Sequence, residues 1–287
     1  MGKAEEGEKA DERDWQSEHP TKRVHGSLKG RRLGMETLST PTIRYYSDLD
    51  LNRLQRGKVP RHIALILDGN RRFAKKKNLF VFQGHQAGAD IILDIVKAGK
   101  ELGIKTMTLF VFSTENWNRS VIEVNALMQL FESFILGNIP EMLANQIRFD
   151  TIGDISRFPE GVKAAIAKAR EATKDCTGVT ALFAMNYGAR DEILRAVKKI
   201  AGLVKAGTVD PEALTEEKMG SYLDTSKYPD PDLLIRTAGV QRMSNFLLWQ
   251  LSYAELYITE VLWPEFTPHH LLEAVVEFQT RERRLGA

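Results

Sequence analysis

The sequence contains a single cysteine, Cys176, which excludes an intrachain disulfide and a Cys-based zinc site. No apolar run approaches the roughly 18 residues that span a bilayer. The opening residues, MGKAEEGEKADERD, lack the apolar core of a signal peptide. The formal net charge of +2 gives no sign of a nucleic-acid partner. These absences predict a cytoplasmic protein that works in a reducing compartment.

Polar and charged residues fill the first part of the chain. Residues 1–40 show almost no hydrophobic periodicity, so we expect a disordered tail that cannot bury enough surface to offset its ordering entropy. With 43% hydrophobic residues overall, the remainder can form a sizeable core. We therefore predict one folded domain over residues 41–287.

Short apolar runs alternate with segments of helical period from there on. The strand candidates are residues 62–68, 105–113, 147–153, 179–188, 232–238 and 255–262. The helix candidates are residues 89–103, 123–135, 158–172 and 189–204. Strands that are apolar on both faces, each followed by a helix, predict an α/β fold with a mostly parallel central sheet of about six strands flanked by helices. Ligands of such sheets bind outside the carboxyl ends of the strands.

The first predicted strand ends in Asp68, followed by Gly69, Asn70, Arg71 and Arg72. Glycine allows a positive φ, so the amides that follow can face an anion. Two arginines can bind phosphate oxygens, and the carboxylate is then suited to hold Mg²⁺ against a diphosphate. The alternative is a surface turn with solvated charges. The sequence has no P-loop.

The second and fifth predicted strands also end in polar clusters. The second ends in FSTENWNRS, where Ser113 could simply cap a helix, although capping does not explain an indole, an amide and a guanidinium together. Arg236, Arg242 and Ser244 follow the fifth strand and describe a second phosphate cradle, with Glu255 positioned to share a cation. An ion pair at the strand end would be the alternative for Arg236.

The histidines and one apolar stretch add two further hypotheses. His85 follows Gly84 at the start of the first long predicted helix, where it either binds an anion or merely packs. His269 and His270 are expected to cap the last helix. The stretch LMQLFESFILGNIPEML, residues 127–143, is either ordinary core or a slot for an oily tail.

Together these residues resemble the cis-prenyltransferases, the family of undecaprenyl and dehydrodolichyl diphosphate synthases. The resemblance runs from about residue 60 to 287. Its motifs are HIALILDGNRRFAKK, FSTENWNRS, IGDISRFP, NYGARDEI, IRTAGVQRMSNFLLWQLSYAELY and WPEF. It implies a parallel-sheet α/β fold, usually dimeric.

The resemblance also implies roles, position by position. Asp68 resembles the aspartate that binds Mg²⁺ and the allylic diphosphate, and Asn116 resembles the proposed proton acceptor. The surroundings of the allylic diphosphate are matched by Gly69, Asn70, Arg71, Arg72, Phe73 and His85. The segment that closes over the substrates is matched by Ser113, Thr114, Glu115, Trp117 and Arg119. The isopentenyl diphosphate cradle is matched by Arg236, Arg242, Met243 and Ser244, and its metal ligand by Glu255.

The chain departs from the family pattern at two charged positions. Val81 stands three residues before the Gly-His pair, where an arginine is usual, and Val240 stands where an acid is usual. The ending RERRLGA matches the family's Arg-x-Gly tail with Arg284 and Gly286, which implies a contribution to the partner subunit's site.

The resemblance implies condensation of isopentenyl diphosphate with an allylic diphosphate, farnesyl or geranyl, to give a cis-polyprenyl diphosphate. It further implies Mg²⁺ as cofactor, a homodimer, and peripheral contact with a membrane through the lipid product. Two other classes stay open. One is a catalytically silent scaffold subunit of a heteromeric prenyltransferase, and the other is a nucleotide-binding α/β protein.

Overall fold

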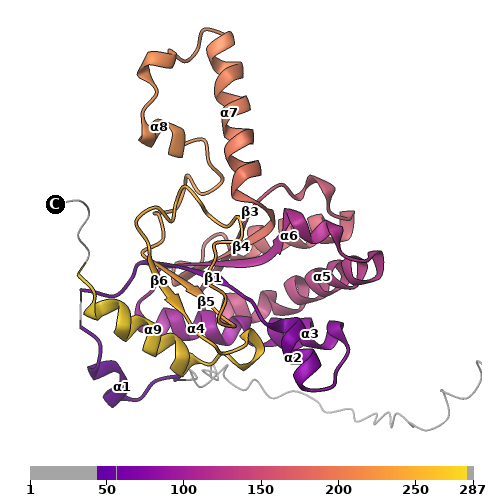
Figure 1. Ribbon diagram of the computed structural model, residues 1–287, viewed down its shortest axis with the longest axis vertical. Coiled ribbons are helices and arrows are strands. Elements are labelled where there is room, and N and C mark those ends of the chain that lie inside the picture. The colour runs from indigo at the N-terminus through magenta and orange to yellow at the C-terminus, as the bar shows by residue number, and fades with distance from the viewer. Residues whose placement is uncertain (1–43, 56, 283–287) are drawn as a thin grey trace, which may run out of the picture. The chain divides into compact units, whose positions relative to one another are not determined.

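Six parallel strands form one central sheet in the computed structural model, which describes residues 44–55 and 57–282 (Figure 1). Their order is β3-β4-β2-β1-β5-β6. Their bounds are β1 His62–Ile66, β2 Thr106–Ser113, β3 Ile147–Ile152, β4 Val179–Tyr187, β5 Leu233–Arg236 and β6 Glu255–Ile258. The expected parallel α/β sheet is confirmed. The predicted tail, residues 1–40, lies outside the described residues, and the domain boundary stays a prediction.

Helices connect the strands. The α-helices are α1 Asp48–Asn52, α2 Asn70–Lys76, α3 Val81–Asp90, α4 Ile92–Leu102, α5 Val121–Ala144, α6 Glu160–Thr173, α7 Ala189–Lys205, α8 Glu216–Gly220 and α9 Pro268–Thr280. Short 3₁₀ helices are η1 Thr114–Asn118, η2 Ile155–Arg157, η3 Pro211–Ala213 and η4 Trp263–Glu265. The helix expected over residues 89–103 is the second half of the α3–α4 pair. No helix in the described part of the chain has the length and apolarity to cross a bilayer.

The two faces of the sheet are covered differently. On one face, Ile63 and Leu65 of β1 belong to a large apolar core that includes residues of α4, α5, α6 and α9. On the other face, Ala64 and Ile66 pack in a smaller cluster with Phe246, which lies in the loop after β5. Successive strand residues point to opposite faces, so β1 must be apolar throughout, and all five of its residues are buried.

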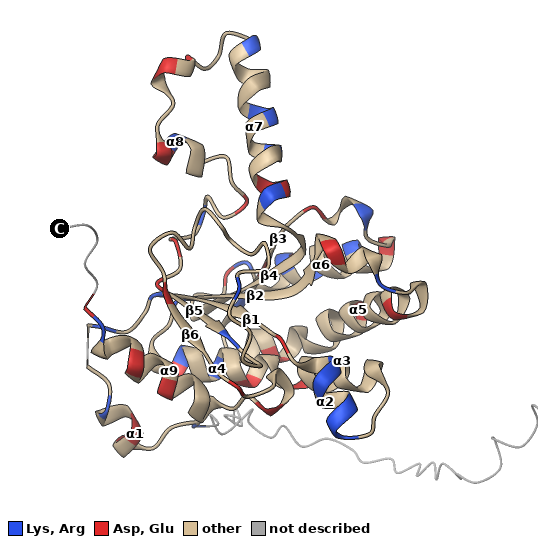
Figure 2. Cartoon of the chain, viewed as in Figure 1, with Lys and Arg blue, Asp and Glu red and all other residues tan. Residues whose placement is uncertain are grey.

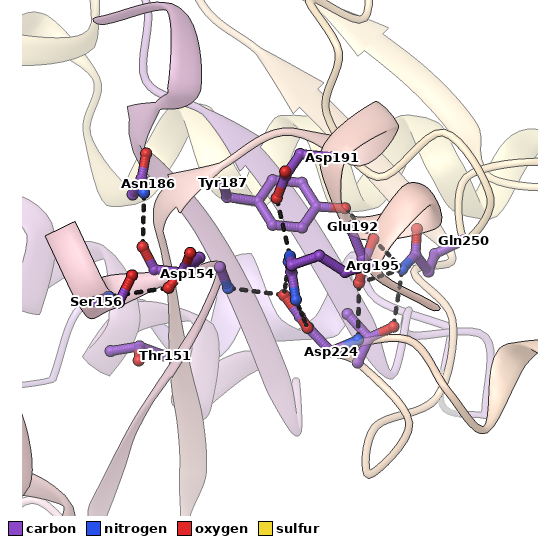
Figure 3. A network of polar contacts seen from close by, with 12 residues as sticks. Thr151, Asp154, Ser156, Asn186, Tyr187, Asp191, Glu192, Arg195, Asp224 and Gln250 are labelled. Atoms are coloured by element: carbon purple, nitrogen blue, oxygen red, sulfur yellow. Dashed lines mark hydrogen bonds and ion pairs between the residues drawn. The ribbon is translucent and has the colours of Figure 1, made fainter. Parts of the chain in front are cut away.

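A buried polar network anchors the loop after β5 to α7 (Figure 3). Glu192 accepts hydrogen bonds from the Tyr187 hydroxyl at 2.5 Å and from the Asp224 amide at 2.9 Å. Gln250 Nε2, which belongs to the loop, donates to the same carboxyl at 3.1 Å. The Arg195 guanidinium binds both oxygens of Asp224 at 2.8 and 2.7 Å. The loop is thereby fixed near Gln250, shortly before β6 begins.

The carboxyl ends of β1, β2 and β5 meet at one edge of the sheet. Ile66 pairs with Phe110 of β2 on one side and with Arg236 of β5 on the other. Asp68 follows two residues after Ile66, and Ser113 ends β2. The polar clusters that the sequence places after three separate strands therefore lie side by side.

Candidate active site

The turn after β1 aims backbone and side chains outward from the sheet edge. Gly69 has a φ of 118° and serves as the N-cap of α2. An added Cβ there would lie 3.0 Å from the Leu262 Cα, so a side chain is excluded by both backbone conformation and space. The chain consequently turns sharply, and Asn70 and Arg71 begin a helix rather than the surface turn considered above.

Two arginines hold the Asp68 carboxylate. Arg236 Nη2 donates to one carboxylate oxygen at 2.8 Å, and Arg72 Nη2 lies 3.3 Å from the other. The backbone oxygen of Asp68 accepts from the Thr237 hydroxyl at 2.6 Å. The carboxylate still keeps 29% of its surface open to solvent. It is therefore fixed in place but accessible to a ligand.

Arg236 is the cation at the base of this site. Its side chain is only 4% exposed, and its Nε is buried without a hydrogen-bond partner. Nη1 donates to the Ser244 hydroxyl at 2.8 Å and to the Arg242 carbonyl. A buried guanidinium with a donor left unpaired is costly unless a further acceptor arrives. This arrangement suits an anionic ligand.

A depression of about 380 Å³ opens around Asp68 and will be called the anion bowl. Its lining residues are Leu67, Asp68, Gly69, Asn70, Arg71, Arg72, His85, Arg119, Val240 and Arg242. Four guanidinium groups and one imidazole share this depression with one carboxylate. Such a surplus of forked cationic donors is what binds phosphate groups.

Glu123, at the start of α5, is a residue that the sequence reasoning missed. Its carboxylate lies 2.6 Å from Arg71 Nη2 and 2.9 Å from Arg119 Nη1, and His85 Nε2 donates to it at 3.3 Å. Burial alone would raise the pKa of this carboxyl, but the charges of Arg119 and Arg71 outweigh it and lower the pKa. Glu123 is thus an internal anion that three cationic or donor groups of the bowl share.

His85 does not begin a helix, contrary to the expectation. Helix α3 begins at Val81, so the His85 side chain faces the bowl from the middle of the helix and not from its amino end. Burial lowers its pKa, and the positive charge of Arg119 acts in the same direction. The imidazole is therefore a neutral hydrogen-bond donor at neutral pH, and an anion site based on helix amides does not apply to it.

The segment Ser113–Arg119 is built partly for structure. Asn116 Oδ1 accepts from the Ser113 amide at 3.1 Å, which caps η1. The Trp117 indole donates to Asn186 Oδ1 at 2.8 Å and packs edge-on against Phe112. Capping and packing therefore explain the side chains of Asn116 and Trp117. Arg119 alone reaches the anion bowl.

The loop after β5 is held in an unusual backbone conformation. Ala238, Ser244 and Asn245 have positive φ values of 69°, 51° and 62°. Asn245 Nδ2 donates to Glu115 Oε1 at 2.9 Å, and Thr114 Oγ1 donates to Glu115 Oε2 at 3.1 Å. The segment after β2 and the loop after β5 are therefore tied together. Met243 packs with the smaller apolar cluster, and Phe73 is half-buried on α2.

An apolar cavity adjoins the anion bowl. Its enclosed space is about 70 Å³, between α3, α5 and the sheet. Its apolar lining includes Val111, Leu127, Leu130, Phe131, Phe134, Ile135, Phe183 and Met185. Leu67, Asn70 and His85 line both this cavity and the bowl. The stretch 127–143 thus contributes both core and cavity wall.

Asn70 stands at the junction of the two spaces, and its Oδ1 is buried without a hydrogen-bond partner. Two glycines of α3 allow α2 to approach closely. A Cβ on Gly84 would lie 2.3 Å from the Asn70 carbonyl oxygen, and one on Gly88 would lie 2.5 Å from Asn70 Oδ1. Helices α2 and α3 are therefore in direct backbone contact at this point.

Glu255 is not brought together with Asp68. It is the first residue of β6 and pairs with Leu233, the first residue of β5. Arg236, which binds Asp68, is at the other end of β5. The Glu255 carboxylate lies 2.9 Å from Arg281 Nη1. Because the strands are parallel, Glu255 lies at their amino ends, whereas Asp68 follows the carboxyl end of β1. The two carboxylates of one chain therefore cannot share a cation.

The remaining expected positions have mixed outcomes. His270 caps α9, as expected, by accepting from the Thr267 amide at 3.1 Å, whereas His269 lies 3.5 Å from Glu273. Val240 lines the bowl, and the Glu260 side chain fills the space beside Gly239, so an acid stands next to the position where the family pattern has one. Arg284 and Gly286 lie outside the described residues. Within those residues, no group of three or more His, Cys, Asp or Glu side chains forms a metal cluster.

A parallel α/β fold with a cationic bowl beside an apolar cavity is suited to a ligand with an anionic head and an apolar tail. Comparison with known proteins places it more closely. Residues 66–286 match the Prenyltransf family model, described as "Putative undecaprenyl diphosphate synthase". The chain belongs to this family and is a cis-prenyltransferase.

Individual relatives agree. The isoprenyl transferase of Clostridium perfringens is 49% identical over 229 residues, covering 80% of this chain and 90% of that protein. The isoprenyl transferase of Geobacillus kaustophilus is 47% identical over 231 residues, with the same coverage. Lavandulyl diphosphate synthase from Lavandula x intermedia, solved with dimethylallyl diphosphate, superposes with a TM-score of 0.78 at 39% identity, covering 80% of this chain and 99% of that one. A probable undecaprenyl diphosphate synthase from Campylobacter jejuni gives 0.67 at 33%, covering 79% and 99%.

Proposed function

We propose that this protein condenses isopentenyl diphosphate with an allylic diphosphate, farnesyl or geranyl, and forms a cis-polyprenyl diphosphate in a Mg²⁺-dependent reaction. The observation that carries the proposal is the continuity between the anion bowl and the apolar cavity at the junction residues Asn70 and His85. A diphosphate head and an isoprenoid tail need these two environments side by side. The lavender relative was solved with an allylic diphosphate, which supports a substrate of the same class here.

The two diphosphates are assigned to two sides of the bowl. Arg71, Arg72 and His85, on α2 and α3 beside the cavity, would bind the allylic diphosphate, whose tail enters the cavity. Arg236 and Arg242, on and after β5, would bind isopentenyl diphosphate together with the Ser244 hydroxyl. The unpaired Nε of the buried Arg236 supports a role in binding an anion.

Asp68 is the residue suited to hold Mg²⁺. This cation is commonly bound in proteins by one or two carboxylates together with substrate phosphates and waters, so a single accessible carboxylate among arginines fits it. When bound, Mg²⁺ supplies charge stabilisation to a departing pyrophosphate. Glu255 is not included in this site, because it faces the opposite edge of the sheet.

The residues of the chain supply orientation and charge. The guanidinium groups of Arg71 and Arg72 stabilise negative charge as pyrophosphate leaves the allylic carbon. The isopentenyl double bond attacks that carbon, and loss of a proton then leaves a new cis double bond. Asn116 uses its side-chain oxygen to cap η1, and an amide is a poor base, so a substrate phosphate oxygen is the better proton acceptor.

Glu123 would compete with the substrate for the same cations. Its carboxylate neutralises Arg71 and Arg119 and accepts from His85. Diphosphate carries more charge and more acceptor oxygens, so it can replace the carboxylate. Glu123 would therefore hold the cationic side chains in order until the substrate arrives.

A homodimer is the second part of the proposal. Strand β6 is at the edge of the sheet; its Leu256 is 46% exposed, and Leu248 in the segment before it is 40% exposed. An exposed edge strand with apolar neighbours is a typical surface for a second copy. The scaffold-subunit alternative is not favoured, because Asp68 and its arginines are retained. A nucleotide-binding protein would need a base pocket, and no residue pattern indicates one.

Turnover of the purified protein tests the proposal. Labelled isopentenyl diphosphate and farnesyl diphosphate, with Mg²⁺, should give a labelled product that extracts into organic solvent. Asp68→Ala should lower turnover by about 10³-fold, as for other essential electrostatic groups, with unchanged circular dichroism. The matched control is Asp90→Ala, an exposed carboxylate on α3. Near-normal turnover in Asp68→Ala would refute the assignment, and ATP binding without any response to farnesyl diphosphate would favour the nucleotide-binding class.

A further inference from the structure

Large apolar side chains are exposed at one end of the helices that enclose the apolar cavity. Phe80, Val81 and Phe82, at and just before the start of α3, are 82%, 40% and 45% exposed. Val121 and Ile122, at the start of α5, are 74% and 84% exposed. We call these five residues the apolar rim. Exposed contiguous apolar surface of this kind marks an interaction site.

The contacts between the helices place the two halves of the rim at the same end. His85 of α3 lies 3.3 Å from Glu123 near the start of α5, and Lys97 of α4 lies 2.6 Å from Glu141 near the end of α5. The α3–α4 pair therefore runs alongside α5 in the same direction. The first residues of α3 and α5 lie next to each other, at the end where His85 reaches the anion bowl.

The rim is bordered by positive charge. The segments that carry it, residues 75–82 (KKKNLFVF) and 119–122 (RSVI), contain three lysines and one arginine but no acidic residue. Lys76 pairs with Glu265 at 2.8 Å and Arg119 pairs with Glu123 at 2.9 Å, so the positive charge of the border rests on Lys75 and Lys77. Figure 2 shows basic residues gathered on α2, directly before the rim. Val81 adds to the contrast, because the family pattern has an arginine there and this chain has an apolar residue. Apolar side chains with a basic border complement a bilayer that contains anionic lipids.

We propose that the apolar rim and the basic end of α2 form a docking surface for an anionic lipid bilayer. Phe80, Phe82 and Ile122 enter the boundary between headgroups and acyl chains, and the lysines of α2 lie against the headgroups. The rim lies at the first turns of α3 and α5, and later residues of the same helices line the cavity, so docking would bring the cavity close to lipid. Docking itself requires no catalysis, although its value to the protein depends on the proposed lipid product.

A second copy of the chain is the competing occupant of this surface. The positive border disfavours it, because two identical basic borders would repel each other at a symmetric contact. The exposed edge at β6 is moreover on another part of the sheet from α3 and α5. Both observations favour lipid over a second copy.

Vesicle sedimentation of the full chain without substrates tests the proposal separately from catalysis. Vesicles of phosphatidylcholine mixed with phosphatidylglycerol should bind the protein, and phosphatidylcholine alone should bind it more weakly. Phe80→Ser/Ile122→Ser should weaken binding by about tenfold or more. Lys77→Gln should weaken it by about fivefold on the anionic vesicles only. The matched control is Leu49→Ser on α1, which removes an equally exposed apolar residue, at 77%, and should bind normally.

The outcomes separate the alternatives. Equal binding of the Phe80→Ser/Ile122→Ser variant and the unmodified chain would overturn the proposal, and so would an unmodified chain that binds neither kind of vesicle. Light scattering on the same samples detects the competing occupant, because a variant that loses its dimer would show that the rim contacts a second copy. Unchanged thermal unfolding and unchanged turnover with a short allylic diphosphate in detergent-free buffer verify that the variants fold. Turnover that fails in every sample would refute the proposed reaction and leave the binding result intact.

Discussion

Two carboxyl-bearing residues contact the loop after β5, Asp68 through Thr237 and Glu192 through Gln250, and their carboxyl groups differ in exposure. Glu192 is 1% exposed and accepts hydrogen bonds from Tyr187, Asp224 and Gln250. Asp68 keeps 29% of its surface open and has beside it an arginine with an unpaired donor. The polar group that is closed by protein stabilises the fold, whereas the one left partly open is available for a ligand.

The largest effect is expected at the open site. Arg236→Met removes the cation that holds Asp68 and that, in the proposed assignment, binds isopentenyl diphosphate, so turnover should fall by about 10³-fold. Stability should change little, because the Asp68 carboxylate that it leaves can contact water and Arg72. Steady-state kinetics and thermal unfolding measure the two effects. Arg53→Met, which breaks the exposed pair with Glu273, is the control. A variant that is clearly less stable but keeps its turnover would contradict the comparison.

At the closed site the expected loss is in stability. Glu192→Ala would leave the buried Tyr187 hydroxyl and the Asp224 backbone amide without an acceptor, at a cost of about 3 kcal/mol of unfolding free energy. Urea unfolding measures this cost. Glu171→Ala, at a side chain that is 74% exposed, should change stability by less than about 0.5 kcal/mol. If the two variants are equally stable, the network of Figure 3 does not hold the loop.

A third effect of similar size should follow pH. His62 begins β1, is fully buried, and has both ring nitrogens within 2.6 and 2.7 Å of Pro229 O and Thr108 Oγ1. Burial lowers the pKa of His62 to about 4, against an ordinary value near 6.5. The unfolded chain binds the proton first, so unfolding free energy is retained above pH 6.5 and is lost as the pH falls towards 4. The loss should approach about 3 kcal/mol.

The pH effect can be assigned to His62 by comparison with a variant. His62→Gln should show a shallower decline of unfolding free energy between pH 6.5 and 4, measured by urea titrations at each pH. An identical pH dependence in both proteins would mean that His62 is already charged in the folded state. Such a result would mean that His62 does not contribute to stability in the way that the enclosed Glu192 does.

The smallest effect is expected at Glu123, which belongs to both classes. Its side chain is only 12% exposed, yet it binds groups of the bowl. Glu123→Gln removes the internal charge that competes with diphosphate, so the KM for the allylic substrate should fall by about threefold, with a stability loss of about 1 kcal/mol. Initial rates over a range of substrate concentrations measure it. An increase in KM would show that Glu123 orients the arginines more than it competes with the substrate.

Much of the fold and the position of the site follow from sequence. Strands apolar on both faces indicated the parallel sheet, and the residues after β1, β2 and β5 indicated its active edge. These patterns are local in the sequence, so they predict local structure without knowledge of the tertiary fold. Asp68 and Arg236 lie in contact because parallel strands of similar register end together.

Residues that depend on tertiary placement could not be predicted. Glu123 reads as one polar position of an apolar helix, and nothing local shows that three groups converge on it. Glu255 was expected near Asp68 because it follows Arg242 closely in sequence, but the loop between them returns the chain to the start of β6. Trp117 and Asn116 resemble binding residues by type, whereas their hydrogen bonds show structural roles. The only available signal for Glu123 was its position three residues after Ser120, which caps α5.

The glycines at which α3 meets Asn70 have a mechanical consequence. With no side chain between them, α2 and α3 lie in direct contact, so a displacement of α3 against α2 would be passed on to Arg71 and Arg72 of α2. Under the proposed reaction, a product chain too long for the apolar cavity would therefore weaken the binding of its own diphosphate. The length of the product would then be limited through the direct contact between α2 and α3.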